Sequence, residues 1–350
     1  MSLTQAHYPV RLEASLLAGA DRWLMFGDYG AAARYNMKLV WVSIACFLVV
    51  DAIWLPMSRL TFAASNWTLI ITIVIAVAGM MAFCALVNWR LRDSDDRIAD
   101  LLRIATKRAE LLWRALFVIA ASAMSGLVFC YLATSAALPL QDELLAAVDR
   151  YIGFDWLGVL TATNAYPVLS RLVVSAYKTT DFMIFFVLLW LSAKGQGERL
   201  SEFLALLSMA SVGVAIGMMI FPAAGAYAFY KPLASQFSNF SVDAGMWHYQ
   251  LFTALRSETP PAINFAVPNG MVTFPSFHTV LGIITTYALR DSRWTLIPAL
   301  AINAVMIFST LPEGGHHLID LFAGAAIAFG AIAIVRLPAW RAARAAAIAA

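Results

Sequence analysis

Residues 67–88 read WTLIITIVIAVAGMMAFCALVN, a run that contains no charged side chain. A helix needs about 20 mostly apolar residues to cross a bilayer, so this run predicts a membrane-spanning helix. Stretches of the same character occupy residues 38–57, 111–133, 168–192, 200–221, 275–290, 294–312 and 316–336. The sequence therefore predicts an all-α fold, a polytopic membrane helix bundle with about eight transmembrane helices.

The composition of the whole chain agrees with lipid as its main solvent. Of the 350 residues, 61% are hydrophobic and 13% are charged, whereas soluble domains carry about 45–50% apolar and about 25% charged residues. Mean hydropathy is +0.75. The net charge of +3 is too small and too scattered for a nucleic-acid-binding protein. Cys46, Cys84 and Cys130 lie inside apolar runs, which favours a role as small hydrophobic residues over disulfides or metal binding.

The distribution of lysine and arginine predicts the orientation, because short cytoplasmic loops carry an excess of both. The loop 89–110 contains Arg90, Arg92, Arg97, Arg103, Lys107 and Arg108. We therefore place this loop and the N-terminus in the cytoplasm, and the segments 134–167 and 222–274 on the extracytoplasmic side. The expected location is a bacterial-type inner membrane or a plasma membrane.

The expected organisation has four parts. Residues 1–37 form a cytoplasmic N-terminal segment, and residues 38–110 form two additional transmembrane helices with the basic loop. Residues 111–336 form a six-helix membrane core, and residues 337–350 form a cytoplasmic tail. Within the outward-facing part, residues 141–158 have apolar side chains at helical spacing. They predict either an amphipathic helix along the outer surface or a solvated connecting helix.

Three of the five histidines open predicted membrane helices. His278 ends the run TFPSFH at 273–278, and His316 and His317 follow Glu313 and two glycines. The orientation above places both helix starts on the extracytoplasmic side, so two distant stretches bring imidazole groups to one membrane level. A helix start also exposes unpaired N–H groups and about half a positive charge, which favours an anion such as phosphate.

His316 and Asp320 lie four residues apart, which places them on one face of a helix. Asp320 can accept a hydrogen bond from one ring nitrogen of His316, fix its tautomer and leave the other nitrogen free for nucleophilic attack. His278, on a different helix, can act as a general acid on a leaving oxygen. These three catalytic candidates suit phosphoryl transfer without a metal ion or another cofactor.

Further candidates bind the substrate: Ser276, His317, Lys178 and Tyr177. Lys178 lies inside an apolar stretch, where a charged residue usually faces a polar cavity or a partner. Its ammonium group can reach a phosphate below the outer headgroups, or it can pair with Asp181 three residues later. His317 points about 100° away from His316 on a helix, which favours a supporting hydrogen bond over nucleophilic attack.

At these residues the sequence resembles the type 2 phosphatidic acid phosphatase superfamily, whose motifs are Lys-x6-Arg-Pro, Pro-Ser-Gly-His and Ser-Arg-x5-His-x3-Asp. Residues 275–278 (Pro-Ser-Phe-His) match the second motif. His316-x3-Asp320 matches the third, with Ser309-Thr310 in place of Ser-Arg. The phenylalanine, the missing arginine and the doubled histidine are similar to the branch that contains inositol phosphorylceramide synthases. In the first motif, Phe185-Phe186 stands where Arg-Pro would follow Lys178.

The resemblance covers residues from about 140 to 336 and implies a lipid phosphatase or phosphotransferase. In it, His316 is the nucleophile that forms a phosphohistidine, His278 protonates the leaving group and Asp320 orients His316. Ser276 and the N–H groups of the helix starts would hold phosphate oxygens. The donors that could replace the missing arginines are Lys178, His317, Lys231 and Arg256. The resemblance implies a lipid-linked phosphate as the substrate, and water or an acceptor alcohol, on a lipid or a polyol, would resolve the intermediate.

Two other classes of protein stay open as alternatives. A transporter of an anionic solute would use Lys178 and Asp181, but the sequence has no inverted repeat and the His-x3-Asp spacing would have no role. A b-type haem electron carrier would use histidines as axial ligands. Such ligands face each other in mid-membrane, whereas His278 and His316 lie at predicted helix ends.

Overall fold

The computed structural model describes residues 23–266, 271 and 273–349. Throughout these residues the regular secondary structure is helical, apart from one isolated β-bridge between Phe62 and Ile263. This confirms the predicted all-α fold. Most of the predicted N-terminal segment 1–37, with His7, lies outside the described residues, and the first long helix begins at Gly30.

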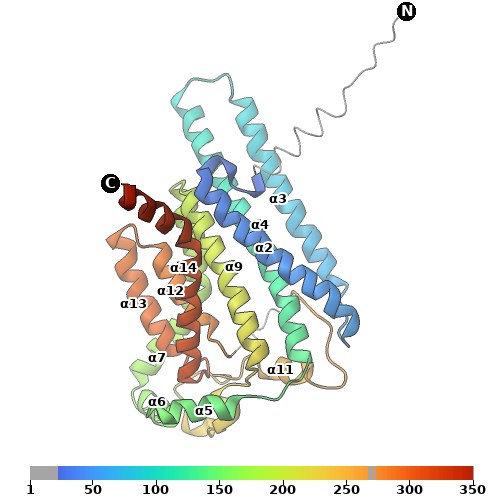
Figure 1. Cartoon of the computed structure of the whole chain (residues 1–350), viewed down its shortest axis with the longest axis vertical. Coiled ribbons are helices and arrows are strands. Elements are labelled where there is room, and N and C mark those ends of the chain that lie inside the picture. The colour runs from blue at the N-terminus through green and yellow to red at the C-terminus, as the bar shows by residue number, and fades with distance from the viewer. Residues whose placement is uncertain (1–22, 267–270, 272, 350) are drawn as a thin grey trace, which may run out of the picture.

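In the described part of the chain, five helices are long and apolar enough to cross a membrane. They are α2 (Gly30–Trp54), α3 (Ser65–Arg90), α4 (Arg97–Ser135), α9 (Gly197–Ile220) and α14 (Leu318–Ala349). All five run lengthwise through the bundle (Figure 1). The chain is therefore an integral membrane protein.

The remaining predicted spans are shorter or bent. α8 (Thr179–Ala193), α12 (Phe277–Ala288) and α13 (Arg293–Ser309) are apolar but have 15, 12 and 17 residues. α6 (Trp156–Asn164) and α7 (Pro167–Tyr177) meet at 113° and together are apolar enough for one broken span. Every predicted stretch is thus helical. Among the described residues, however, five or six segments are long enough to cross a membrane, fewer than the eight that we expected. The stretch 168–192 is interrupted at Lys178, between α7 and α8.

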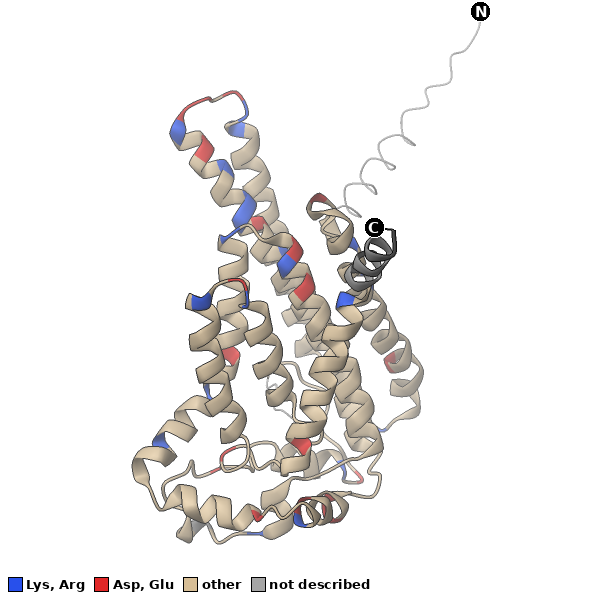
Figure 2. Cartoon of the chain, turned by 60° about the vertical axis from the view of Figure 1, so that its left-hand side comes forward, with Lys and Arg blue, Asp and Glu red and all other residues tan. Residues whose placement is uncertain are grey.

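The two ends of the bundle differ. At one end lie α5 (Asp142–Tyr151), α6 and α11 (Tyr249–Leu255), and we call this the α5 end (Figure 1). At the opposite end α3 and α4 extend beyond the other helices, and Lys and Arg residues gather around the turn that joins them (Figure 2). The short elements are η1 (Gly27–Tyr29), η2 (Leu55–Met57), α10 (Ala226–Tyr230) and η3 (Ala234–Gln236).

The predicted helix at 141–158 is found as α5, which lies across the ends of the long helices (Figure 1). Its buried face carries acidic as well as apolar side chains. Asp142 and Asp149 are 6% and 0% exposed, whereas Leu144 and Tyr151 are 47% and 91% exposed. The inward carboxylates of α5 therefore require polar partners inside the protein.

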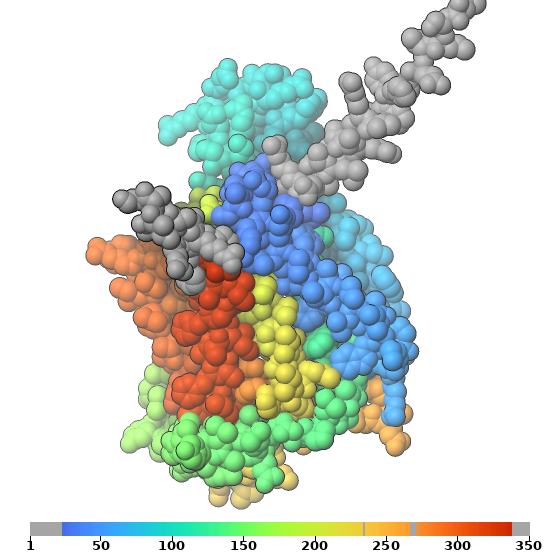
Figure 3. Space-filling model, in the orientation of Figure 1, coloured from blue at the N-terminus to red at the C-terminus, as the bar shows by residue number. Residues whose placement is uncertain are grey.

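One apolar core joins the N-terminal helices to the rest of the bundle. It contains Met37 of α2, Leu111 of α4, Phe203 of α9, Val280 of α12 and Ala328 of α14, all of them buried. α2 packs obliquely against α9, and the two diverge towards the α5 end, where α4 is visible between them (Figure 3). α2 and α4, which precede residue 140, are thus an integral part of the core.

α12 and α14 approach each other very closely where each begins. The Ser276 N–H, just before α12, donates to the Asp320 carbonyl at 3.0 Å. One turn further along α14, a Cβ atom added to Gly324 would lie 2.4 Å from the Ser276 carbonyl oxygen, a distance that real Cβ atoms essentially never show. Gly324 therefore allows the starts of two helices that are distant in the sequence to lie side by side.

Gly324→Ala should separate these two helix starts, because the added methyl group meets backbone and not a flexible side chain. We expect a loss of about 1–3 kcal/mol of stability, as for other overpacked sites. The measurement is the thermal unfolding temperature in detergent. Gly330→Ala, also on α14, is the matched control because nothing lies within 4 Å of its added Cβ. Equal unfolding temperatures for the two variants would contradict this account of the packing.

Candidate active site

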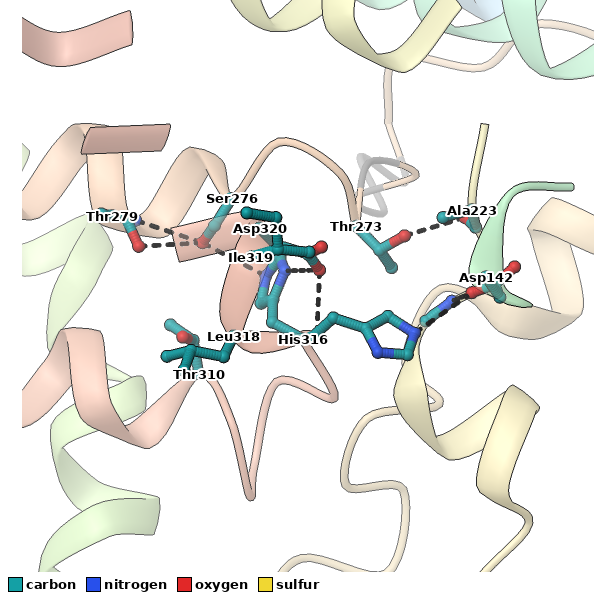
Figure 4. A network of polar contacts seen from close by, with 12 residues as sticks. Asp142, Ala223, Thr273, Ser276, Thr279, Thr310, His316, Leu318, Ile319 and Asp320 are labelled. Carbon is teal, nitrogen blue, oxygen red and sulfur yellow. Dashed lines mark hydrogen bonds and ion pairs between the residues drawn. The ribbon is translucent and has the colours of Figure 1, made fainter. Parts of the chain in front are cut away.

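His316 and Asp320 form a hydrogen-bonded pair at the start of α14 (Figure 4). His316 Nδ1 lies 3.1 Å from Asp320 Oδ2, and the two residues are 3% and 0% exposed. The carboxylate accepts the Nδ1 proton, so the tautomer of a neutral ring leaves a lone pair on Nε2. The same Oδ2 accepts the His317 backbone N–H at 3.0 Å, which fixes the carboxylate in turn.

The surroundings of His316 keep its ring neutral. Burial lowers the pKa of His316 to about 4, and the charge of His317 acts in the same direction. A neutral imidazole has the lone pair that a nucleophile requires, whereas a protonated one does not. His316 is therefore ready to act as a nucleophile near neutral pH.

His278 reaches the same place from α12. Its ring centroid lies 6.0 Å from that of His316, and the rings stand at 71°. On its other side, His278 stacks on Tyr177 with centroids 4.7 Å apart. Tyr177 packs against the loop before α14, where a Cβ atom on Gly314 would lie 2.8 Å from its ring. The starts of α12 and α14, together with Tyr177 at the end of α7, thus hold the two imidazoles at one site.

Ser276 links the two helix starts. Its hydroxyl caps α12 by accepting the Thr279 N–H at 3.3 Å, and it lies 3.5 Å from His316 Nε2 (Figure 4). Among the described residues, the N–H groups of Phe277 and His278 have no hydrogen-bond acceptor. The start of α12 therefore has two free donors directly after Ser276, whose hydroxyl contacts His316 Nε2.

The start of α14 already holds an anion. Asp149 of α5 accepts the N–H groups of Leu318 and Ile319 at 2.8 and 2.9 Å. These are the first free donors of α14, and a carboxylate is stabilised there as a phosphate would be. The expectation that both helix starts hold phosphate oxygens is therefore wrong for α14, where a side chain from α5 takes that place.

His317 lies between two carboxylates of α5. Its Nδ1 is 3.6 Å from Asp149 Oδ2, and its Nε2 is 3.7 Å from Asp142 Oδ1. Burial opposes a charge on this fully buried ring, but the two carboxylates outweigh it and raise the pKa of His317 to about 9. The adjacent histidines therefore differ: His316 is neutral and His317 is cationic at neutral pH.

Backbone and side-chain contacts hold the loop before α14 in place. Trp156 Nε1 donates to the His316 carbonyl at 3.1 Å, and the Tyr227 hydroxyl donates to the Pro312 carbonyl at 2.6 Å. Gly315 adopts φ +71°, and its carbonyl accepts the Ala226 N–H at 2.7 Å. Contacts from α6 and α10 thus fix the position of His316.

Within the part of the chain that the structure describes, no hydrogen bond or ion pair joins Lys178 to His278, His316 or Asp320. Lys178 occupies the break between α7 and α8, its side chain is exposed, and among the described residues it forms no ion pair with Asp181 within 4.0 Å. Of the other donors, Arg256 bonds the Leu138 carbonyl and Lys231 lines a separate cavity at the α5 end. The phosphate-binding role of Lys178 stays a prediction.

Several buried polar residues of the site were not recognised from the sequence. They are Asp142, Asp149, Trp156, His248 and Glu313. Asp142 and Asp149 are seven residues apart on a helix, hence on one face, and this spacing was the available signal. Within the described residues, no group of three or more His, Cys, Asp or Glu side chains is arranged to hold a metal ion.

The stability of the protein should fall as the pH rises through about 9. The folded-state pKa of His317 is raised from 6.5 to about 9, so its stabilisation is complete below pH 6.5 and lost as the pH passes 9. His317→Gln should remove this decline, measured as unfolding temperature from pH 6.5 to about 9.5.

His248→Gln is the control for this experiment. Burial lowers the pKa of His248, whose Nε2 lies 3.0 Å from the Ala224 carbonyl oxygen, so its ring is already neutral over that pH range. This variant should keep the wild-type slope. If the unfolding temperature of His317→Gln fell with pH as much as that of the wild type, His317 would not be the charged group responsible for the decline.

Comparison with known proteins agrees with this geometry. Searches of curated proteins and of solved structures found no match. A family model described as the PAP2 superfamily matches residues 143–334, which include His278, His316, Asp320 and all of α5 except Asp142. The match begins after α2, α3 and α4, so it leaves out the stretch 111–133 that we had assigned to the six-helix core. Since the match covers more than half of the chain, this protein belongs to the PAP2 superfamily of phosphatase- and phosphotransferase-type membrane enzymes.

Proposed function

We propose that this protein cleaves or transfers a lipid-linked phosphate through a phosphohistidine on His316. The observation that carries the proposal is the convergence of the His316–Asp320 pair with Ser276 and His278, which come from a segment 40 residues earlier. Superfamily membership supports the reaction class, and the membrane bundle supports a lipid substrate.

The geometry suggests the order of bond changes. His316 Nε2 attacks phosphorus, and the bond between phosphorus and the lipid oxygen breaks while His278, which enters this step in its protonated form, gives that oxygen its proton. Asp320 stabilises the imidazolium through Nδ1–H. Water or an acceptor hydroxyl then attacks the phosphohistidine, and His278 takes its proton, which restores both histidines. None of these steps uses a metal ion.

The start of α12 offers the donors for the phosphoryl oxygens. The Ser276 hydroxyl lies 3.5 Å from His316 Nε2, and the free N–H groups of Phe277 and His278 follow it directly in the chain. Donors fixed in the folded protein stabilise the charge that develops on these oxygens without further reorganisation. The two arginines missing from the superfamily motifs are in this way partly replaced by backbone groups.

We assign the α5 end, with the site, to the extracytoplasmic side. Lys and Arg residues gather around the α3–α4 turn at the opposite end (Figure 2), as expected for a cytoplasmic face. The altered second and third motifs favour the branch similar to inositol phosphorylceramide synthases. On that assignment, the second step transfers a phospho-headgroup to an alcohol on a lipid or a polyol.

The deciding experiment incubates purified protein with labelled phospholipids, with and without acceptor alcohols. Free phosphate or a new phospholipid is expected from the wild type. His316→Ala should abolish both products, and His278→Ala should lower kcat by about 10²–10⁴-fold, the usual contribution of a general acid. Mass spectrometry should find phosphate on His316. Activity at the wild-type level in folded His316→Ala, judged by gel filtration, would refute the mechanism.

Lys178→Ala should raise KM about tenfold and leave kcat nearly unchanged, because one charged donor to the phosphate is lost before the reaction. Lys178→Arg should recover part of the affinity. Lys194→Ala is the control, since Lys194 ends the same helix far from the site and stacks on Trp190 at 5.0 Å. An unchanged KM in Lys178→Ala would remove this residue from the substrate site.

A further inference from the structure

A cavity between the long helices adjoins the site at His278. It has a volume of about 280 Å³ and lies between α2, α4, α9 and the start of α12. Phe47, Gly126 and Val214 are among its walls, and His278 is part of its lining. The cavity thus connects helices outside the family match with a histidine inside it.

The walls of this cavity are apolar. No Asp, Glu, Lys or Arg is among the residues that line it. Its two serines use their hydroxyls elsewhere, since Ser122 contacts the Ser208 hydroxyl at 3.3 Å and Ser211 donates to the Leu207 carbonyl at 2.9 Å. Apart from the Cys130 thiol, His278 is the polar group that remains. A suitable ligand is therefore a hydrocarbon chain with a polar end at His278.

Small residues on α4 create this space and leave it open to lipid. A Cβ atom on Gly126 would lie 3.9 Å from the Phe47 ring, and Ala123, one turn earlier, is exposed. α2 and α9 diverge at this level, with α4 between them (Figure 3). A chain can therefore enter sideways from the bilayer, without passing through water.

The connection between α2 and α3 is fastened to the α5 end beside this cavity. Asn66 donates to the Ile263 carbonyl and accepts the Phe265 N–H, both at 2.8 Å. Ile263 and Phe265 share a small apolar cluster with Met271, which lines the cavity. The N-terminal helices are thus held in the position that closes one side of the cavity.

We propose that this cavity binds the hydrocarbon tail of the lipid whose phosphate reacts at His316. The inference rests on the proposed function and assigns α2 and α4 to recognition of the tail. His278 lies where the two parts of the substrate would meet. Its ring is 6.0 Å from that of His316, where the phosphate would react, and the same residue lines the tail cavity. A substrate with a long chain should bind through both parts, and one with a short chain through the phosphate alone.

Gly126→Leu tests this proposal, because its side chain would fill the cavity beside Phe47. The measurement is kcat/KM for dioleoyl phosphatidate and for dibutyryl phosphatidate. The ratio of the long-chain to the short-chain value should fall about tenfold or more, since several buried methylene groups lose their contacts. Ala215→Phe, on the α9 wall, should lower the same ratio.

Gly79→Leu is the matched control, since nothing lies within 4 Å of an added Cβ at this exposed position of α3. It should leave the ratio unchanged. An unchanged ratio in both Gly126→Leu and Ala215→Phe would overturn the tail site while leaving the proposed reaction intact.

A binding measurement separates the two proposals if the wild type releases phosphate from neither lipid. Hexadecyl phosphate should then raise the unfolding temperature of the wild type and of Gly79→Leu, but not of Gly126→Leu, whereas butyl phosphate should affect none of them. This pattern would support the tail site although the proposed function had failed. An equal shift by hexadecyl phosphate in all three proteins would refute it.

Discussion

A single carboxylate oxygen organises the site. Asp320 Oδ2 accepts both the His316 ring proton and the His317 backbone N–H, so one atom fixes the tautomer of one histidine and the main chain of the next. The carboxylate is fully buried, and water cannot replace either donor. It keeps this position because the Asp320 carbonyl bonds Ser276 at the start of α12, where Gly324 leaves room for the contact. The positions of His316 and His278 therefore depend on one helix contact.

α5 supplies the charge balance that makes this burial possible. Isolated buried charges are costly unless they are paired and hydrogen-bonded. Asp149 accepts two N–H groups of α14, Asp142 accepts those of Ala224 and Gly225, and the cationic His317 lies between the two carboxylates. A cationic ring next to His316 also disfavours a second charge there. The charge of His317 thus helps keep the ring of His316 neutral.

The sequence predicted the membrane helices from runs of apolar residues and the His316–Asp320 pair from a spacing of four residues, and each of these signals lies within a single segment. The role of α5 was not predictable in this way, because its carboxylates act on backbone groups some 80 and 170 residues away. The break at Lys178 was also missed, although the polar run Lys-Thr-Thr-Asp at 178–181 interrupts the apolar stretch at this point. Spacing within one segment predicts a pair such as His316 and Asp320. Contacts between segments depend instead on how closely two helices pack, as α12 and α14 do at Gly324.

On the proposed function, the part of the chain that the family model matches and the helices before it have different physical requirements. The residues proposed for chemistry lie within 143–334, whereas α2 and α4 supply two of the walls beside His278. Phosphoryl transfer requires fixed donors and a fixed nucleophile, which tolerate little change in position. A hydrocarbon chain makes non-directional contacts, so its cavity can change with the size of a few side chains. On the proposed function and tail site, α2 and α4 would set which lipid reacts without altering His278 and His316.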